Sequence, residues 1–218
     1  MLNLRTRGCP VCDWLTGRMF DFFAKWQYAL ASNESAQTTF AAAGGFCPLH
    51  TWQLAEMASP EGLSVGLPLL MNRLSRDLSN STGPASADST VARLRPVGHC
   101  AACHFLASEE QAAVSHLAEM IRTEPGLALC RESQGVCFSH LRWLLTMVDS
   151  EVLRGELLAI AARRCTEWAE DMQNYAMKRD AIRKALLNRD EEDAYYRAII
   201  HLAGAKALCL PAQEETRI

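Results

Sequence analysis

Apolar residues recur three and four residues apart along most of this chain, which is the pattern of amphipathic helices. The first such run begins at Pro10, a residue suited to the first turn of a helix because it has no amide hydrogen to leave unpaired. Asn33 then offers a cap for a short helix that stops at the glycine pair 44–45, and a third helix begins at Pro48. The same spacing predicts a fourth helix over residues 59–80.

The second part of the chain repeats this plan after a segment without a periodic apolar face. Residues 81–97 have the glycine, serine and proline content of a linker. After them we expect a helix over residues 101–123, a break at Pro125-Gly126, a short helix to Gln134 and a further helix from about residue 138. We therefore predict an all-α fold, with a first helical repeat at residues 1–80, a linker at 81–97 and a second repeat at 98–218.

The second copy differs from the first because it continues into a long helix over residues 150–187 and a short final helix that stops at Gly204. The long helix carries a stripe in alternate steps of three and four, formed by Leu158, Ala161, Cys165, Trp168, Met172, Tyr175, Arg179, Ile182 and Leu186. Small and aromatic residues favour a seam that packs against the chain's own helices, because coiled coils prefer Leu, Ile and Val. A homodimer through this helix is the alternative.

The composition is that of a globular protein with its own hydrophobic core. The chain has 218 residues, of which 49% are hydrophobic and 22% charged, and its formal net charge is −3. This charge gives no support to binding of nucleic acid or a membrane surface. The amino terminus has no apolar signal segment and no stretch reaches the roughly 18 apolar residues of a membrane span. We therefore expect a cytoplasmic protein.

One metal-ligand motif is present twice. Cys9-Pro-Val-Cys12 is followed by Cys47-Pro-Leu-His50, and Cys100-Ala-Ala-Cys103 is followed by Cys137-Phe-Ser-His140. The intervals are 35 residues from Cys12 to Cys47 and 34 from Cys103 to Cys137. A pair of cysteines two residues apart can chelate one tetrahedral ion, and a second pair completes its four ligands. We therefore expect one Cys3His set in each copy.

The positions of these motifs support metal ligation. All four pairs fall at predicted helix starts, where free amides and the positive end of the helix dipole stabilise thiolates. The nine cysteines are an odd number, which favours metal ligation in a reducing compartment over a disulfide framework. Six of them would be ligands, and the other three have no assigned role: Cys130, Cys165 and Cys209. A thioredoxin-like redox motif is disfavoured because the strands of that fold are missing.

Zinc is the expected metal, because paired Cys-x-x-Cys and Cys-x-x-His elements are typical of closed zinc sites. Two [4Fe-4S] clusters held by the same side chains are the alternative, and they would make an electron-transfer protein. Cys100 to His104 also reads as a c-type haem attachment sequence. The first copy has Asp13 at the position of His104, however, and haem would leave Cys137 and His140 without a role. His99 and His104 flank the second Cys-x-x-Cys pair and are candidates for alternative ligands or for hydrogen-bond partners of the ligands.

The motifs as a whole resemble those of a bacterial family of uncharacterised, largely helical proteins. The resemblance rests on Cys-Pro-x-Cys, a later Gly-Phe-Cys-x-x-His and a following aromatic residue, Trp52 or Trp143, and it covers about residues 8–204. It implies that the eight ligands act together, and it implies nothing about activity. The second copy departs from the motif at Ala101 and Val136, which replace the proline and the phenylalanine.

These features predict a two-site zinc protein that acts as an intracellular interaction or regulatory module. We expect no enzyme activity, because no nucleophile with an adjacent base and no phosphate-binding loop can be identified. A sensor whose zinc thiolates are oxidised is a further alternative. Basic pairs recur on the long helix, at residues 163–164, 178–179 and 183–184, but interleaved acidic residues indicate a solvated face and not a nucleic-acid surface. We expect protein partners.

Overall fold

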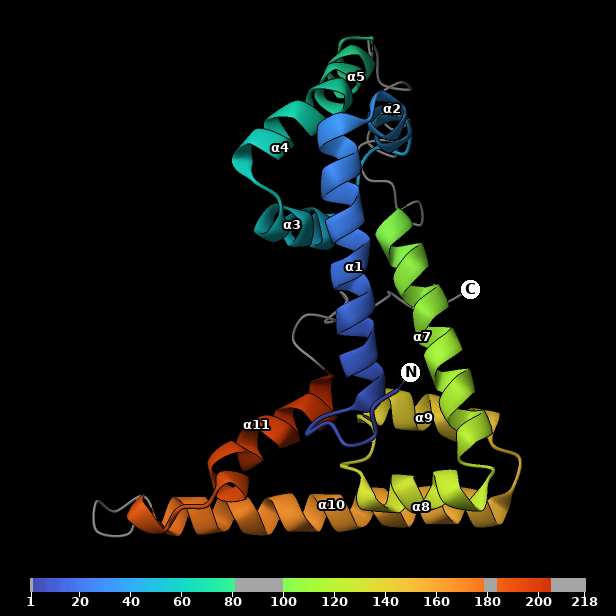
Figure 1. Cartoon of the computed structure of the whole chain (residues 1–218), viewed down its shortest axis with the longest axis vertical. Helices are drawn as coiled ribbons and strands as arrows, with labels where there is room; N and C mark the ends of the chain where they lie inside the picture. Colours follow the sequence, from blue (N-terminus) through green and yellow to red (C-terminus); the bar gives the residue numbers. More distant parts are fainter. Residues whose placement is uncertain (1, 81–99, 179–183, 205–218) are drawn as a thin grey trace. The chain divides into compact units, whose positions relative to one another are not determined.

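The computed structural model describes residues 2–80, 100–178 and 184–204 of the chain. Within these ranges it is built from helices and has no strand, which confirms the all-α prediction (Figure 1). The α-helices are α1 (Pro10–Ser32), α2 (Glu34–Ala42), α3 (Pro48–Met57), α4 (Pro60–Gly66), α5 (Pro68–Ser79), α7 (Ala101–Met120), α8 (Glu124–Glu132), α9 (Phe138–Met147), α10 (Glu151–Met177) and α11 (Arg189–Ala203), and a short 3-10 helix, η1, spans Lys184–Leu186. The predicted linker lies outside the described residues.

The chain forms two compact units that do not coincide with the two sequence copies. Unit 1 consists of Met1–Thr16 and Glu110–Ile218, and unit 2 consists of Gly17–Glu109. The start of α1 therefore belongs to unit 1 and the rest of α1 to unit 2, whereas α7 begins in unit 2 and ends in unit 1. Each unit contains segments from both copies.

In unit 2, the segments of α1 and α7 run antiparallel. Arg18 pairs with Glu109 at 2.8 Å between Nε and Oε2, and the ring of Phe22 stacks on Phe105 with centroids 4.7 Å apart. Residue numbers thus rise along α1 as they fall along α7. Aromatic rings from α1, α2 and the loop before α3 extend this packing, and Phe46 contacts Phe23 and Phe40 edge to face. Because Phe46 precedes Cys47, this core fixes the loop that carries a candidate ligand.

Glycines shape the loop that precedes Cys47, as the sequence predicts. Gly44 and Gly45 have positive φ values of 78° and 79°, which L residues with a side chain rarely adopt. A Cβ atom on Gly45 would also lie 2.9 Å from Leu70 Cδ2. Gly135, before Cys137, repeats the conformation with φ 77° but has open space around it. The two loops therefore turn in the same way, although only the first is tightly packed.

In unit 1, α11 packs along α10, and η1 and α11 follow the long helix in the chain (Figure 1). Asn188 caps α11 in a reciprocal pair of hydrogen bonds with Glu191, and Gly204 ends it with φ 80°. The final helix and its stop were both expected from the sequence. None of the helices in the described ranges is long and apolar enough to cross a membrane.

Two predicted helices differ from the structure. The fourth one is two helices, because Pro68 cannot continue a helix that ends at Gly66 and instead begins α5. The long helix ends at Met177, ten residues earlier than predicted. Its buried face agrees with the predicted stripe only in part: Trp168 is buried as predicted, but Leu157 and Ile160 are also buried, whereas Leu158 and Cys165 are exposed. The buried side of α10 is the one against which neighbouring helices such as α9 and α11 pack.

Candidate metal centres

The eight candidate ligands come together in two clusters, but their grouping differs from the prediction. Cys9, Cys12, Cys137 and His140 form site 1, which lies in unit 1. The second cluster, site 2, lies in unit 2 and consists of Cys47, His50, Cys100 and Cys103. The expectation of one complete set within each copy is therefore wrong. Each Cys-x-x-Cys pair instead meets the Cys-x-x-His pair of the other copy.

Site 1 is formed where the start of α1 meets the start of α9. His140 Nδ1 lies 3.3 Å from Cys9 Sγ, 3.6 Å from Cys12 Sγ and 3.1 Å from Cys137 Sγ. The sulfur atoms of Cys12 and Cys137 are 3.9 Å apart. All four side chains are buried. One nitrogen therefore faces three sulfurs in a closed space.

Site 2 repeats this arrangement where the start of α3 meets the start of α7. His50 Nδ1 lies 3.1 Å from Cys47 Sγ, 3.5 Å from Cys100 Sγ and 3.3 Å from Cys103 Sγ. The sulfur atoms of Cys47 and Cys103 are 3.7 Å apart. His50 and Cys100 are buried, but Cys47 and Cys103 are half-buried. The two sites thus share their geometry and differ in their exposure.

The distances fit a single tetrahedral ion. Tetrahedral zinc with bonds of about 2.3 Å to sulfur and about 2.0 Å to nitrogen would separate its ligand atoms by about 3.5–3.8 Å. The sulfur pairs at 3.7 and 3.9 Å lie close to the expected sulfur–sulfur separation, and the sulfur–nitrogen distances of 3.1–3.6 Å lie at or slightly below the expected sulfur–nitrogen separation. In each cluster all four ligand atoms lie within 4.8 Å of one another. The donors therefore suit one ion at the centre of each set.

The helix starts hold the ligands in equivalent conformations. Cys47 is the N-cap of α3 with φ −63° and ψ 163°, and Cys137 is the N-cap of α9 with φ −64° and ψ 161°. Neither side chain caps its own helix, so both sulfurs remain directed at the clusters. Cys9 and Cys100 directly precede α1 and α7. The positive ends of four helix dipoles thus lie beside six sulfur atoms, which favours thiolates.

The pKa values show that the clusters attract positive charge. Burial alone would lower the pKa of His140, but its contacts with Cys137, Cys9 and Glu110 outweigh burial and raise that pKa to about 12. At site 2, burial opposes ionisation of Cys100, yet His50 and the backbone amides of Cys47 and Cys103 lower the pKa of Cys100 to about 6. Each cluster therefore favours positive charge between its side chains. A divalent metal ion would compete with protons for the same sulfur and nitrogen atoms.

Glu110 supports the histidine of site 1, and sequence reasoning missed this role. Its Oε1 lies 2.9 Å from His140 Nε2, the nitrogen that faces away from the sulfurs. A carboxylate at this position fixes the ring orientation of a metal-binding histidine and makes its other nitrogen a better ligand. Among the described residues, His50 has no such carboxylate contact. The repeat places Met19 at the position that corresponds to Glu110, since each follows the second cysteine by seven residues.

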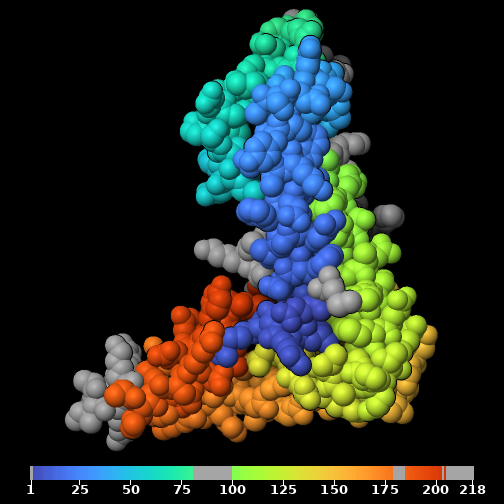
Figure 2. All heavy atoms as spheres, in the orientation of Figure 1, coloured from blue at the N-terminus to red at the C-terminus, as the bar shows by residue number. Residues whose placement is uncertain are grey.

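The helix α11 covers site 1. Figure 2 shows the first residues of the chain in dark blue against the orange-red atoms of the last helix. A Cβ atom on Gly8 would lie 3.4 Å from Ile200, and one on Gly204 would lie 3.8 Å from Cys12 Sγ. Arg7 forms ion pairs with Asp190 and Asp193 at the start of α11. Through these contacts α11 and the amino-terminal segment together shield site 1 from solvent.

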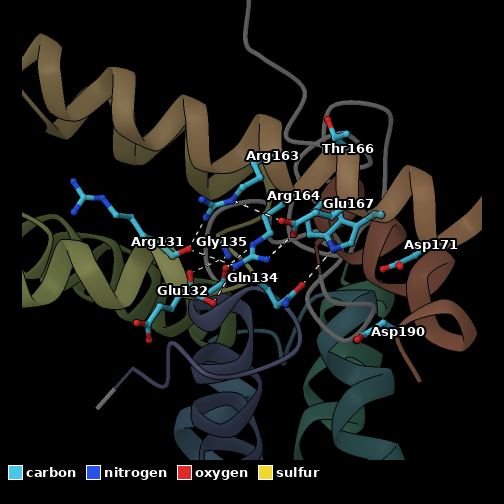
Figure 3. A network of polar contacts seen from close by, with 12 residues as sticks. Arg131, Glu132, Gln134, Gly135, Arg163, Arg164, Thr166, Glu167, Asp171 and Asp190 are labelled. Atoms are coloured by element: carbon cyan, nitrogen blue, oxygen red, sulfur yellow. Dashed lines mark hydrogen bonds and ion pairs between the residues drawn. The ribbon is translucent and has the colours of Figure 1, made fainter. Parts of the chain in front are cut away.

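A polar network holds the loop that leads to Cys137. Arg163 and Arg164 reach toward the carboxyl end of α8, where Arg164 donates to the carbonyl groups of Glu132 and Ser133 (Figure 3). Gln134 Oε1 accepts hydrogen bonds from Trp168 and Arg197 at 3.3 Å each. These bonds cap α8 and fix the start of the ligand loop.

His201 ties α11 to the same loop. Its ring nitrogens lie 2.8 Å from the carbonyl oxygen of Arg197 and 3.0 Å from that of Gln134, and its ring packs on Trp168 with centroids 4.1 Å apart. His201 is buried, so these contacts lie inside unit 1.

The remaining candidates lie apart from the clusters or outside the described residues. Cys130 is buried, and burial raises the pKa of its thiol, whereas Cys165 is exposed. His104, named in the haem interpretation, is exposed, and Cys100 and Cys103 lie together with Cys47 and His50. His99 and Cys209 are not among the described residues. A small cavity of about 20 Å³ beside Cys130 and Trp168 has room for one water molecule and none for a larger ligand.

Comparison with known proteins adds no further assignment. Neither a protein-family model, nor a curated protein, nor a solved structure matches the chain. The resemblance to a bacterial helical family therefore stays a prediction from the sequence motifs.

Proposed function

We propose that the protein is a two-site zinc protein in which each ion joins the two sequence copies and acts structurally. The observation that carries the proposal is the compactness of the donor sets, with three sulfurs and one nitrogen within 4.8 Å in both clusters. Four protein ligands complete a tetrahedral shell, so no position is left for a substrate or a catalytic water. The proposed role is that of an interaction or regulatory module and not of an enzyme.

The same compactness favours zinc over an iron–sulfur cluster. A four-iron cluster has one iron behind each protein ligand, so the ligand atoms are held apart by the width of the whole cluster. Sulfur pairs at 3.7 and 3.9 Å leave room for one ion only. The eight described cysteines are free thiols, in keeping with a reducing compartment such as the cytoplasm.

We propose protein partners and not nucleic acid. The basic residues of α10 that a nucleic acid would contact are engaged within unit 1: Arg164 binds the end of α8 and Glu167, and Arg163 donates to the carbonyl group of Arg131. Apolar side chains of α11 are exposed instead, namely Tyr195, Tyr196, Ile199 and Leu202. Such a face is typical of protein contacts.

Elemental analysis and a visible spectrum of protein purified without oxygen test the proposal. We expect about two zinc ions per chain and no absorption band at visible wavelengths. Cys12→Ser should leave about one tightly bound zinc, because site 2 stays complete. Cys165→Ser changes an exposed cysteine outside both clusters and should keep both ions. A brown protein with iron, or a protein that folds unchanged without metal, would contradict the proposal.

A further inference from the structure

The sulfur atoms of the two clusters differ in their access to solvent. Cys9, Cys12, Cys137 and Cys100 are 1–3% exposed. Only Cys47 and Cys103, among the six ligand cysteines, are half-buried. Both belong to site 2, and they are direct neighbours with their sulfur atoms 3.7 Å apart. Site 2 therefore presents one open edge that consists of two adjacent thiolates.

The surroundings of the clusters increase this difference. The helix α11 covers site 1, with Gly204 next to Cys12 Sγ, and Glu110 holds His140 in place. Within the described residues, site 2 has neither a carboxylate behind its histidine nor a helix that corresponds to α11.

Building on the proposed two-site zinc function, we propose that Cys47 and Cys103 are a site of reversible oxidation, where a peroxide forms a disulfide bond and releases the metal of site 2 alone. The thiolate of Cys103 or Cys47 attacks one peroxide oxygen, the O–O bond breaks, and a sulfenic acid forms as hydroxide leaves, or an alkoxide where the peroxide is organic. The other thiolate then attacks that sulfur and displaces a second hydroxide. Two sulfurs thus lose two electrons in all, and the peroxide, with two protons, becomes two molecules of water, or water and an alcohol.

The disulfide bond would take two of the four donors from site 2. Only Cys100 and His50 would remain, so the affinity for zinc would fall and the ion would leave. The new bond would join the start of α3 to the start of α7, the same two segments that the metal joined. The sulfurs need to approach from 3.7 Å to about 2.05 Å, a small movement at two helix ends. A dithiol reductant would therefore regenerate the site without refolding of the unit.

The test uses the full chain with Cys165→Ser, which removes the one exposed cysteine that the described part of the chain has outside the clusters. Hydrogen peroxide is added in the presence of a coloured zinc indicator, and a sample without peroxide measures spontaneous release. We expect one zinc ion to leave at least about tenfold faster than the other, since oxidation selects accessible thiolates. Peptide mapping at half release should find the Cys47–Cys103 disulfide bond, and a dithiol with added zinc should restore the second ion.

Two variants identify which site releases its zinc ion faster. Cys137→Ser leaves only site 2 complete and should lose its tight zinc at the fast rate, whereas Cys47→Ser leaves only site 1 and should show the slow rate. Equal rates for both ions in the full chain, or a first disulfide bond between any other pair of cysteines, would overturn the inference. A protein without about two zinc ions before peroxide is added would contradict the proposed function itself.

Discussion

At the residue scale, the contact between Glu110 and His140 distinguishes the two sites. The carboxylate lies behind the histidine of site 1, and the other copy has Met19 at the corresponding position. A histidine whose other ring nitrogen is held by a carboxylate loses less freedom when it binds a metal ion. Site 1 should therefore bind zinc more tightly than site 2.

Glu110→Gln should weaken zinc binding at site 1 by about 10–100-fold, because the amide cannot accept the histidine proton with the strength of a carboxylate. Competition with a chelator of known affinity measures the change. The matched control is Glu109→Gln, which removes the pairing with Arg18 in unit 2 and should leave the affinity of site 1 unchanged. Equal effects of the two substitutions would show that Glu110 does not support the ligand.

The glycines before Cys47 and Cys137 allow a second comparison. Gly45 and Gly135 share positive φ values near 78°, and only Gly45 has a close neighbour, Leu70. Gly135→Ala should lower the free energy of unfolding by about 1–2 kcal/mol through backbone strain alone. Gly45→Ala adds a clash to that strain and should cost more. Denaturant unfolding of both variants in excess zinc measures the difference, and an equal cost would argue against the close packing around Gly45.

At the scale of elements, charged side chains hold α11 to the amino-terminal segment and to α10. Asp193 accepts hydrogen bonds from Arg7 and from Arg197, and Arg197 is 5% exposed and also pairs with Asp171. Burial alone would raise the pKa of Asp193, but the two guanidinium groups outweigh burial and lower it. The charged form of Asp193 thus stabilises the attachment of α11 over site 1.

This stabilisation should depend on pH. It is fully present above the ordinary aspartate pKa of about 4 and is lost as the pH falls through the lowered pKa of the folded protein. Wild-type protein and Asp193→Asn are unfolded with denaturant from pH 7 to pH 3. We expect a constant difference between them down to about pH 5 and a shrinking one below. Acid also removes metal from both proteins, so the difference between them is the informative quantity, and a difference that does not change with pH would contradict the role of Asp193.

Most elements could be predicted from the sequence, because their ends carry strong local signals. Pro10, Asn33 and Gly204 mark boundaries that the structure confirms. The prediction failed where tertiary packing decides. Leu157 and not Leu158 is buried, because the buried side of α10 depends on where helices such as α9 and α11 pack against it. Pro68 is a local signal for a new helix start, but the apolar spacing continues across it and led to the prediction of one helix.

At the scale of the whole molecule, the eight residues that cluster could be predicted, but their grouping could not. The spacing of the cysteines and histidines identifies which side chains come together, and the 35-residue interval is equally compatible with pairing within a copy or between copies. The choice depends on which helix starts meet in each compact unit, a long-range property that local sequence does not carry. Glu110 was missed for the same reason, because it lies on α7 and supports a ligand on α9.

Crossed pairing predicts that the metals join the two copies. A protease site placed within residues 81–97 would divide the chain between the copies, and each ion would still bind two side chains from each half. The cleaved halves should stay together on size-exclusion chromatography while zinc is present. A strong chelator should weaken their association, and readdition of zinc should restore it. Halves that separate with one zinc ion each would indicate pairing within the copies.

Zinc content after paired substitutions tests the crossed arrangement most directly. Cys12→Ser with Cys137→Ser removes two ligands from site 1 and leaves site 2 complete, so about one zinc ion per chain should survive dialysis against a weak chelator. Cys12→Ser with Cys47→Ser removes one ligand from each site, and no tightly bound zinc should remain. The reverse result, with zinc retained by the second variant and lost by the first, would contradict the account.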